Sequence, residues 1–202
     1  MAYSDFTLDD LKKKVGISSR VKSIFENIVA TPASQALRED LEEVKTLRIR
    51  TEKAKSEWIV VPILNELRKR NNRYFTIYSG ESLNVDKDNG LQGECDFILA
   101  KDVQTFDLSY PIIQIVEAKK HDIEIGIPQC MAQLLGAKIF NDTHQTPVSK
   151  IYGCVTTGDD WLFMYLENET VYIDNKRYYI TEIDQILGVF QSIIDYYKKE
   201  LK

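Results

Sequence analysis

The stretch Ile112–Lys120 constrains the fold more than any other part of the chain. It is a short, largely β-branched apolar run that ends abruptly in charge at Glu117 and Lys119. Such a run predicts a buried strand. Successive side chains of a strand point to opposite faces, so Glu117 and Lys119 share one face and Ala118 points away. Burying a charge is costly unless it is paired or binds a metal, and this strand end is therefore the first candidate for a functional site.

The composition limits the class of protein. With 202 residues, 44% of them hydrophobic and 28% charged, the chain fits one domain with its own core. The net charge of −5 argues against a strongly basic nucleic-acid-binding surface, so a polyanion would have to be met by a local patch or by a metal ion. No apolar run approaches the roughly 18 residues that span a bilayer, and no signal peptide is evident. We therefore expect a cytoplasmic protein without membrane contact. The three cysteines form no CxxC pair, which predicts reduced, buried thiols.

Residues 1–50 are expected to form a helical N-terminal extension. Thr7 and Asp10 have the spacing of a capping box, with Asp in the place of Glu. The three helices expected here cover residues 7–15, 18–31 and 34–47. We interpret this region as a helical cap or as an arm for a homodimer.

The remainder of the chain is expected to alternate between helices and strands. Thr51–Arg70 has a helical apolar stripe, and Pro62 predicts a kink or a helix start within it. Gly126 to Pro128 predicts the start of the next helix, because Pro is favoured in a first turn. The other expected elements are strands at 73–80, 91–100, 112–120, 150–157, 161–167, 170–174 and 177–181, and helices at 129–141 and 182–202. A loop is expected at 101–110. Trp161, Phe163 and Tyr165 alternate, which favours core or dimer packing over base stacking.

A second carboxylate is expected close to Glu117. Asp96 lies within the preceding strand, so a neighbouring strand can bring the two carboxylates together. Two carboxylates at one point repel unless something positive lies between them, and Mg²⁺ commonly takes one or two protein carboxylates together with waters. A metal-bound water is more acidic than bulk water and can attack phosphorus. Lys119 could orient that water or stabilise the charge that develops on the phosphate.

These residues resemble a known signature. Asp96 with Glu117-Ala118-Lys119 is similar to the D…ExK pattern of the PD-(D/E)XK nuclease superfamily, which has the restriction-endonuclease-like fold with an αβββαβ core. Gln129-Cys-Met-Ala-Gln133-Leu resembles the glutamine-bearing helix of several branches, including nuclease domains of type I restriction subunits. Glu52, with Glu57 as its rival, resembles the carboxylate of the first core helix. The resemblance covers roughly residues 51–160.

The resemblance implies a role for each residue. Asp96, Glu117 and the carbonyl of Ala118 would bind Mg²⁺ or Mn²⁺, and Lys119 would be catalytic. Supporting roles would fall to Gln129, Gln133 and Glu52. The chain departs from the pattern in two places: Cys95 stands where the family has Pro, and the second glutamine stands where some branches carry Tyr.

We therefore expect an α/β protein with a restriction-endonuclease-like αβββαβ core at 51–202, a helical extension at 1–50, and an added C-terminal β-hairpin and helix. The expected function is metal-dependent hydrolysis of nucleic acid, with DNA as the favoured substrate. The alternative is a catalytically inactive nuclease-fold protein that acts as a nucleic-acid-binding or assembly module. A purely structural interpretation also stays open, in which Glu117 and Lys119 are a solvated ion pair at a strand edge.

Overall fold

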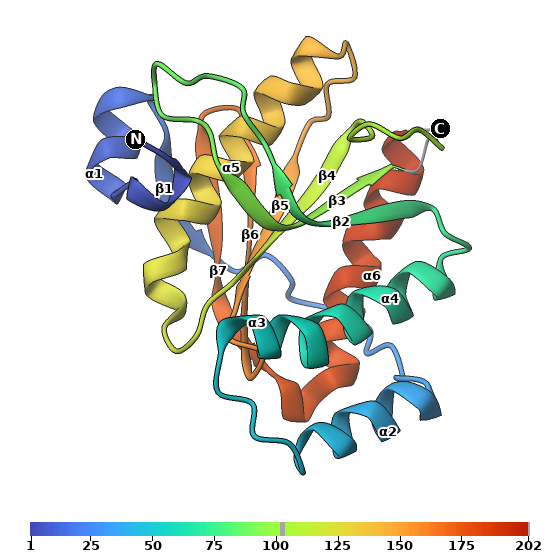
Figure 1. Ribbon diagram of the computed structural model, residues 1–202. Coiled ribbons are helices and arrows are strands. Elements are labelled where there is room, and N and C mark those ends of the chain that lie inside the picture. Colours follow the sequence, from blue (N-terminus) through green and yellow to red (C-terminus); the bar gives the residue numbers. More distant parts are fainter. Residues whose placement is uncertain (102–103, 202) are drawn as a thin grey trace.

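The protein is a mixed α/β structure in this computed structural model, which describes residues 1–101 and 104–201 (Figure 1). Within this described part, one seven-stranded sheet has the order β1-β7-β6-β5-β4-β3-β2. Its strands are β1 (Ser18–Lys22), β2 (Phe75–Ser82), β3 (Glu94–Lys101), β4 (Ile112–Ala118), β5 (Ile151–Thr156), β6 (Asp160–Glu167) and β7 (Thr170–Tyr179). The expected loop at 101–110 includes positions 102–103, and the expected last helix includes position 202; these lie outside the described residues.

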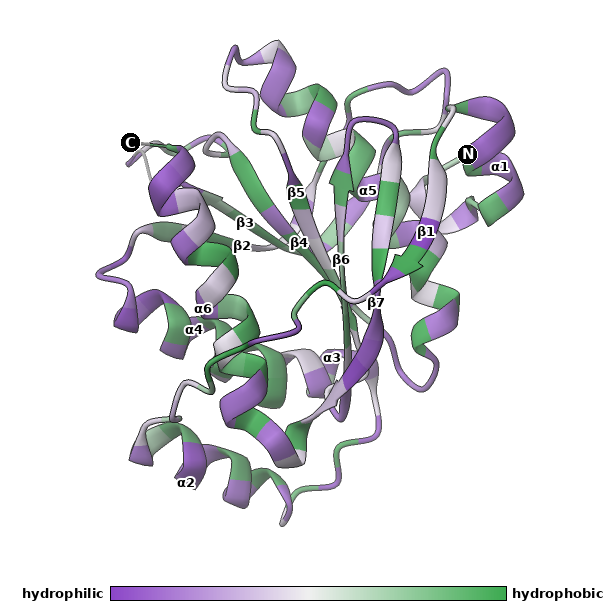
Figure 2. Cartoon of the chain, turned by 180° about the vertical axis from the view of Figure 1, so that it is seen from behind, coloured by the Kyte–Doolittle hydropathy of each residue, from purple (hydrophilic) through white to green (hydrophobic). Residues whose placement is uncertain are grey.

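Helices cover both faces of the sheet. The α-helices are α1 (Leu8–Lys14), α2 (Gln35–Val44), α3 (Glu52–Lys55), α4 (Val61–Arg70), α5 (Ile123–Thr143) and α6 (Ile183–Glu200). A π-helical segment, η2 (Ser56–Val60), joins α3 to α4, and the 3₁₀ helices are η1 (Tyr3–Asp5) and η3 (Ile180–Glu182). The rear view shows helices that alternate between hydrophobic and hydrophilic residues (Figure 2). Such amphipathic helices bury one side against the sheet.

Strand β4 lies in the middle of the core, as its sequence predicts. All seven of its residues are buried. Ile113 and Val116 join the core cluster that contains α4 and α6, whereas Ile112 and Ile115 join the cluster that contains α5. β4 pairs in parallel with β5 and antiparallel with β3. A strand covered on both faces needs apolar side chains at nearly every position, which explains why the run is largely β-branched.

The order of elements through the middle of the chain also agrees with the sequence prediction. α4, β2, β3, β4, α5 and β5 follow one another in this order. Trp161, Phe163 and Tyr165 are buried in the core cluster beneath α6, which confirms their predicted packing role. The three cysteines are free and buried. No helix in the described ranges has the length and apolar character to cross a membrane.

The helix expected at 18–31 is wrong. Ser18–Lys22 is instead the edge strand β1, parallel to β7, and all five of its side chains are exposed. An exposed strand carries no hydrophobic period to mark it, and its backbone hydrogen bonds come from the free edge of β7, which local sequence does not reveal. The N-terminal region is therefore not wholly helical, because it contributes a strand to the sheet.

Two element boundaries also differ from the sequence prediction. α5 begins at Ile123 rather than near Pro128, because the side chain of Asp122 caps it by accepting a hydrogen bond from the backbone N–H of Glu124 at 2.8 Å. Pro128 thus lies inside the helix. The strands expected at 170–174 and 177–181 are one strand, β7, whose register against β6 shifts between Leu162 and Met164. A β-bulge of this kind bends a strand without ending it.

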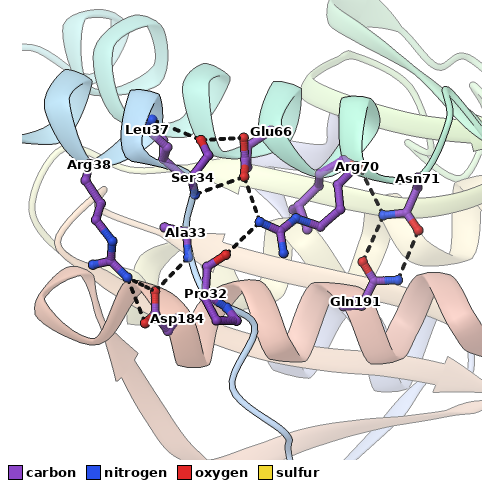
Figure 3. Close-up of polar contacts among 11 residues, drawn as sticks. Pro32, Ala33, Ser34, Leu37, Arg38, Glu66, Arg70, Asn71, Asp184 and Gln191 are labelled. Atoms are coloured by element: carbon purple, nitrogen blue, oxygen red, sulfur yellow. Dashed lines mark hydrogen bonds and ion pairs between the residues drawn. The ribbon is translucent and has the colours of Figure 1, made fainter.

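The segment that leads into α2 is tied between α4 and α6 (Figure 3). The backbone N–H of Ala33 donates to Asp184 of α6 at 2.9 Å. The backbone N–H of Ser34 donates to Glu66 of α4 at 3.2 Å, and Arg70 pairs with the same carboxylate at 2.9 Å. Side chains from two helices therefore satisfy backbone groups of an irregular segment, which holds that segment against the domain.

A glycine in α6 permits this close contact, and substitution tests it. A Cβ at Gly188 would lie 2.5 Å from the carbonyl oxygen of Val29 and 2.7 Å from the side chain of Ile28. Gly to Ala in a helix ordinarily stabilises a protein, but here we expect Gly188→Ala to lower the free energy of unfolding by about 1–3 kcal/mol through overpacking. Chemical denaturation measures this change. Gln185→Ala, on the same helix, is the control; an increase in stability for Gly188→Ala would contradict the described contact.

Candidate acidic site at the end of β4

The pairing of β3 with β4 brings Asp96 to Glu117. Phe97 lies opposite Val116 in the antiparallel register, so the next position along places Asp96 beside Glu117. The backbone N–H of Ala118 donates to Asp96 Oδ2 at 2.7 Å. A hydrogen bond also links the side chains of Asp96 and Glu117. The two carboxyl groups therefore meet, as the sequence predicts.

Glu117 is buried with both oxygens engaged. Its residue exposure is 1%. Lys119 Nζ donates to Oε1 at 2.5 Å, and Gln133 Nε2, from α5, donates to Oε2 at 2.7 Å. The other polar atom of this amide, Gln133 Oε1, is buried and accepts no hydrogen bond from the residues that the structure describes. The site thus contains a carboxylate with a hydrogen-bond donor at each oxygen, and beside it the amide oxygen of Gln133, for which the described residues supply no donor.

Burial sets the protonation of the site. It raises the pKa of Glu117 to about 7, with a further increase from the charge of Asp96, while Lys119 and Gln133 act in the opposite direction. Burial also raises the pKa of Asp96, although the Ala118 N–H opposes this. Burial acts to lower the pKa of Lys119, but the adjacent Glu117 outweighs it and the pKa is raised. Lys119 is therefore protonated at neutral pH, and the acidic pair shares its charge unequally.

Glu52 approaches the site from the first core helix. Glu52, Glu57 and Asp96 line one cleft of about 370 Å³. The charge of Glu52 raises the pKa of both Asp96 and Lys119. Glu57 shows no such effect and instead lies 3.8 Å from Lys53, with its side chain 56% exposed. The geometry thus favours Glu52 over Glu57 as the helix carboxylate that belongs to the candidate site. The π-helical segment that follows shifts the helical register between Glu52 and the buried face of α4.

The two glutamines of α5 do not have equal positions. Gln133 contacts Glu117 directly. Gln129 lies one turn earlier and is half-buried, and its side chain makes no hydrogen bond to any of the described residues. The structure therefore brings Asp96, Glu117, Lys119, Gln133 and Glu52 together, whereas Gln129 stays outside their hydrogen-bond network.

Sequence reasoning missed two features of the site. Gly126 allows α5 to approach Lys119, because a Cβ there would lie 2.5 Å from Val155 and 3.0 Å from Cγ of Lys119. No signal in the sequence points to this role, because the helix is expected to start only at Gly126 to Pro128, whereas α5 begins at Ile123. Glu94 lines the same cleft as Asp96. Glu94 lies two residues before Asp96 on β3, so the two side chains share one face of the strand. The sequence alone could therefore have indicated Glu94 as a member of the site.

The donor set is suited to a hard divalent cation. Mg²⁺ takes oxygen ligands and is often held by one or two carboxylates, and Asp96 and Glu117 supply two adjacent ones. Within residues 1–101 and 104–201, no three His, Cys, Asp or Glu side chains are arranged to hold a metal together. Each oxygen of Glu117 accepts one hydrogen bond, from Lys119 or Gln133, and has a second lone-pair site that can face a metal ion. The residues present therefore fit a site of two carboxylates and waters better than a cage made only of protein side chains.

Comparison of this chain with family models, with curated protein sequences and with solved structures finds no match. The interpretation of the site therefore depends on its own geometry.

The raised pKa of Glu117 predicts a pH-dependent stability. A carboxyl with a folded pKa of about 7 and an ordinary value of 4.5 contributes most stability below 4.5, and this contribution is lost as the pH rises through 7. Glu117→Gln removes that loss, so we expect its Tm to exceed the wild-type Tm by several degrees at about pH 8 and the difference to shrink towards about pH 4. Thermal denaturation at several pH values measures the difference. Glu57→Gln, at an exposed carboxylate, should show no such trend, and a Tm for Glu117→Gln below wild type at pH 8 would refute the prediction.

Proposed function

We propose that this protein is a divalent-metal-dependent nuclease of the PD-(D/E)XK type, which hydrolyses phosphodiester bonds of nucleic acid, with DNA as the favoured substrate. One observation carries the proposal: Asp96 and Glu117 meet at the end of a buried strand, with Lys119 hydrogen-bonded to Glu117. A carboxyl pair in which Glu117 is buried and Asp96 half-buried, with an adjacent lysine, is costly to a fold, and such costs concentrate at functional sites.

The architecture supports the proposal. The elements α4, β2, β3, β4, α5 and β5 follow the αβββαβ order of a restriction-endonuclease-like core. Asp96 lies on the second strand of this series and Glu117 on the third, as the D…ExK pattern requires. Gln133 comes from the helix that follows, and Glu52 from the helical segment that precedes.

In this proposal Asp96, Glu117 and the Ala118 carbonyl would hold Mg²⁺ or Mn²⁺. The metal ion, when bound, would supply positive charge for the phosphate and increase the acidity of a water. Lys119 is protonated at neutral pH, so it acts as a donor that stabilises negative charge on the phosphate and not as a base. Gln133 is a positioning residue, because its amide N–H fixes one oxygen of Glu117.

The second candidate is a nuclease-fold protein without catalysis, which serves as a nucleic-acid-binding or assembly module. One observation favours it: both oxygens of Glu117 already accept hydrogen bonds, from Lys119 and Gln133. In that case the lysine neutralises the glutamate permanently and does not reach a substrate. The two candidates differ in whether the protein cleaves nucleic acid, which is directly measurable.

A cleavage assay tests the proposed nuclease. The protein is incubated with single- and double-stranded DNA and RNA, with Mg²⁺, Mn²⁺ or a chelator. We expect metal-dependent cleavage that falls by about 100-fold or more in Lys119→Ala, because a charge that stabilises the transition state is removed. Lys120→Ala is the matched control, since Lys120 is the adjacent but exposed lysine. Binding without cleavage would favour the assembly module, and cleavage that survives loss of both Asp96 and Lys119 would disprove this site.

The two glutamines provide a second test. We expect Gln133→Leu to weaken Mg²⁺ affinity by about 10- to 100-fold, because the hydrogen bond that orients Glu117 is lost. Gln129→Leu, one turn away on the same helix, should leave the affinity unchanged. Calorimetric titration of Mg²⁺ measures both values. Equal losses in the two variants would indicate a general effect on α5 and would contradict a specific role for Gln133.

A further inference from the structure

A second cavity lies apart from the acidic site, across the sheet and at the opposite strand ends. It has a volume of about 610 Å³, in the range of small-molecule sites. Tyr152, near the start of β5, lines it, whereas Val155, near the end of β5, pairs with Glu117. Tyr152 also belongs to the α6 side of the core, whereas Glu117 contacts α5. We call this cavity the tyrosine–lysine pocket; its walls are residues 22–28, Lys150, Tyr152, Tyr165, Ser192 and Tyr196.

Two ammonium groups lie close to one ring of the pocket. Lys22 Nζ lies 5.1 Å from the ring centroid of Tyr165, and Lys150 Nζ lies 4.7 Å from the same centroid. The two charges are therefore separated by no more than the sum of these distances, about 10 Å. Lys22 also lies 4.2 Å from the ring centroid of Tyr172, and Lys150 lies 5.7 Å from that of Tyr196. Ring faces thus hold both cations at the pocket through cation–π contacts.

These charges are not fully neutralised by carboxylates. Within the ranges that the structure describes, Lys22 has no ion-pair partner within 4 Å, and its hydrogen bond is to the Tyr165 side chain. Lys150 lies 3.7 Å from Glu167, longer than a direct hydrogen bond, so its N–H groups can serve another acceptor. Glu26 is the only carboxylate among the described wall residues, and it is exposed. The pocket can therefore accept an anion.

The rest of the wall combines polar and apolar groups. Ser23 and Asn27 are exposed, and Ser192 is half-buried with its hydroxyl donating to the carbonyl of Val189 at 2.8 Å. Phe25 and Ile28 are half-buried and pack against the core beside them. A ligand in this pocket would therefore meet positive charge and hydroxyl groups as well as an aromatic and an aliphatic side chain.

We propose that the tyrosine–lysine pocket binds a small phosphate monoester. The phosphate would lie between Lys22 and Lys150, and the organic part would pack on Phe25 and Ile28. Two separate ammonium groups match the charge of a phosphate dianion better than they match that of a single carboxylate. The hydroxyl and amide groups of the pocket suit the several acceptor oxygens of a phosphate. The pocket neither overlaps nor contacts the acidic site, so this proposal stands independently of nuclease activity.

Isothermal titration with adenosine 5′-monophosphate as the probe tests the proposal, with EDTA present to exclude metal-dependent binding elsewhere. We expect binding with a Kd of about 1 mM or tighter, and no comparable binding of adenosine. Lys22→Gln combined with Lys150→Gln should weaken the Kd by about tenfold or more, and the corresponding Lys→Arg pair should retain binding. Lys12→Gln with Lys87→Gln, which removes two exposed lysines elsewhere, is the matched control.

Circular dichroism and Tm establish whether each variant is folded. If the double variant does not fold, Lys22→Gln and Lys150→Gln are tested singly. Three results would overturn the proposal: no binding of the monophosphate, adenosine binding as tightly as the monophosphate, or an unchanged Kd in the folded Lys→Gln variants. Loss of cleavage in Lys119→Ala with unchanged binding of the monophosphate would show that the two sites are separate.

Discussion

The carboxylate of Glu117 is the constraint on which the candidate site depends. It is 1% exposed, yet both of its oxygens accept hydrogen bonds, from Lys119 and from Gln133. Removing a carboxylate from water is expensive, and these two donors offset the cost only in part. The raised pKa of Glu117 expresses the remainder. A fold selected for stability alone would be better served by an apolar residue here, which is why we propose a function for this position.

Three features of the packing bring Glu117 together with its partners. The β3–β4 register brings Asp96 alongside. The parallel pairing of β4 with β5 requires a crossover, and α5 provides it and carries Gln133 back across the strand end. Gly126 lets α5 approach closely enough for its contact with the stem of Lys119. The chemistry at this end of the sheet therefore follows from how one strand is covered, and not from a dedicated loop.

The opposite end of the sheet is organised differently. There the N-terminal region adds β1 beside β7 and continues as an irregular segment over the sheet, where Glu66 and Asp184 anchor it. The tyrosine–lysine pocket lies between this segment, β5, β6 and α6. Charge is stabilised at the two ends by different means: at the acidic end by hydrogen bonds inside the core, and at the pocket by aromatic ring faces near the surface.

The sequence by itself determined the core and most of the candidate site. The apolar run of β4 predicts a fully covered strand, and period-two alternation, which is a local property, predicts that Glu117 and Lys119 share one face. The sequence places Asp96 on the preceding strand, and the β3–β4 register then brings it beside Glu117. Tertiary structure alone decided that Ser18–Lys22 is a strand, since the free edge of β7 supplies its hydrogen bonds. Tertiary structure also decided that Gln133, and not Gln129, contacts Glu117, and that Glu52, and not Glu57, acts on the charge of Asp96. Residues one turn or a few positions apart in a helix differ only in what packs against them. The pocket formed by Lys22 and Lys150 has no sequence signature, since its two charges come from segments far apart in the chain.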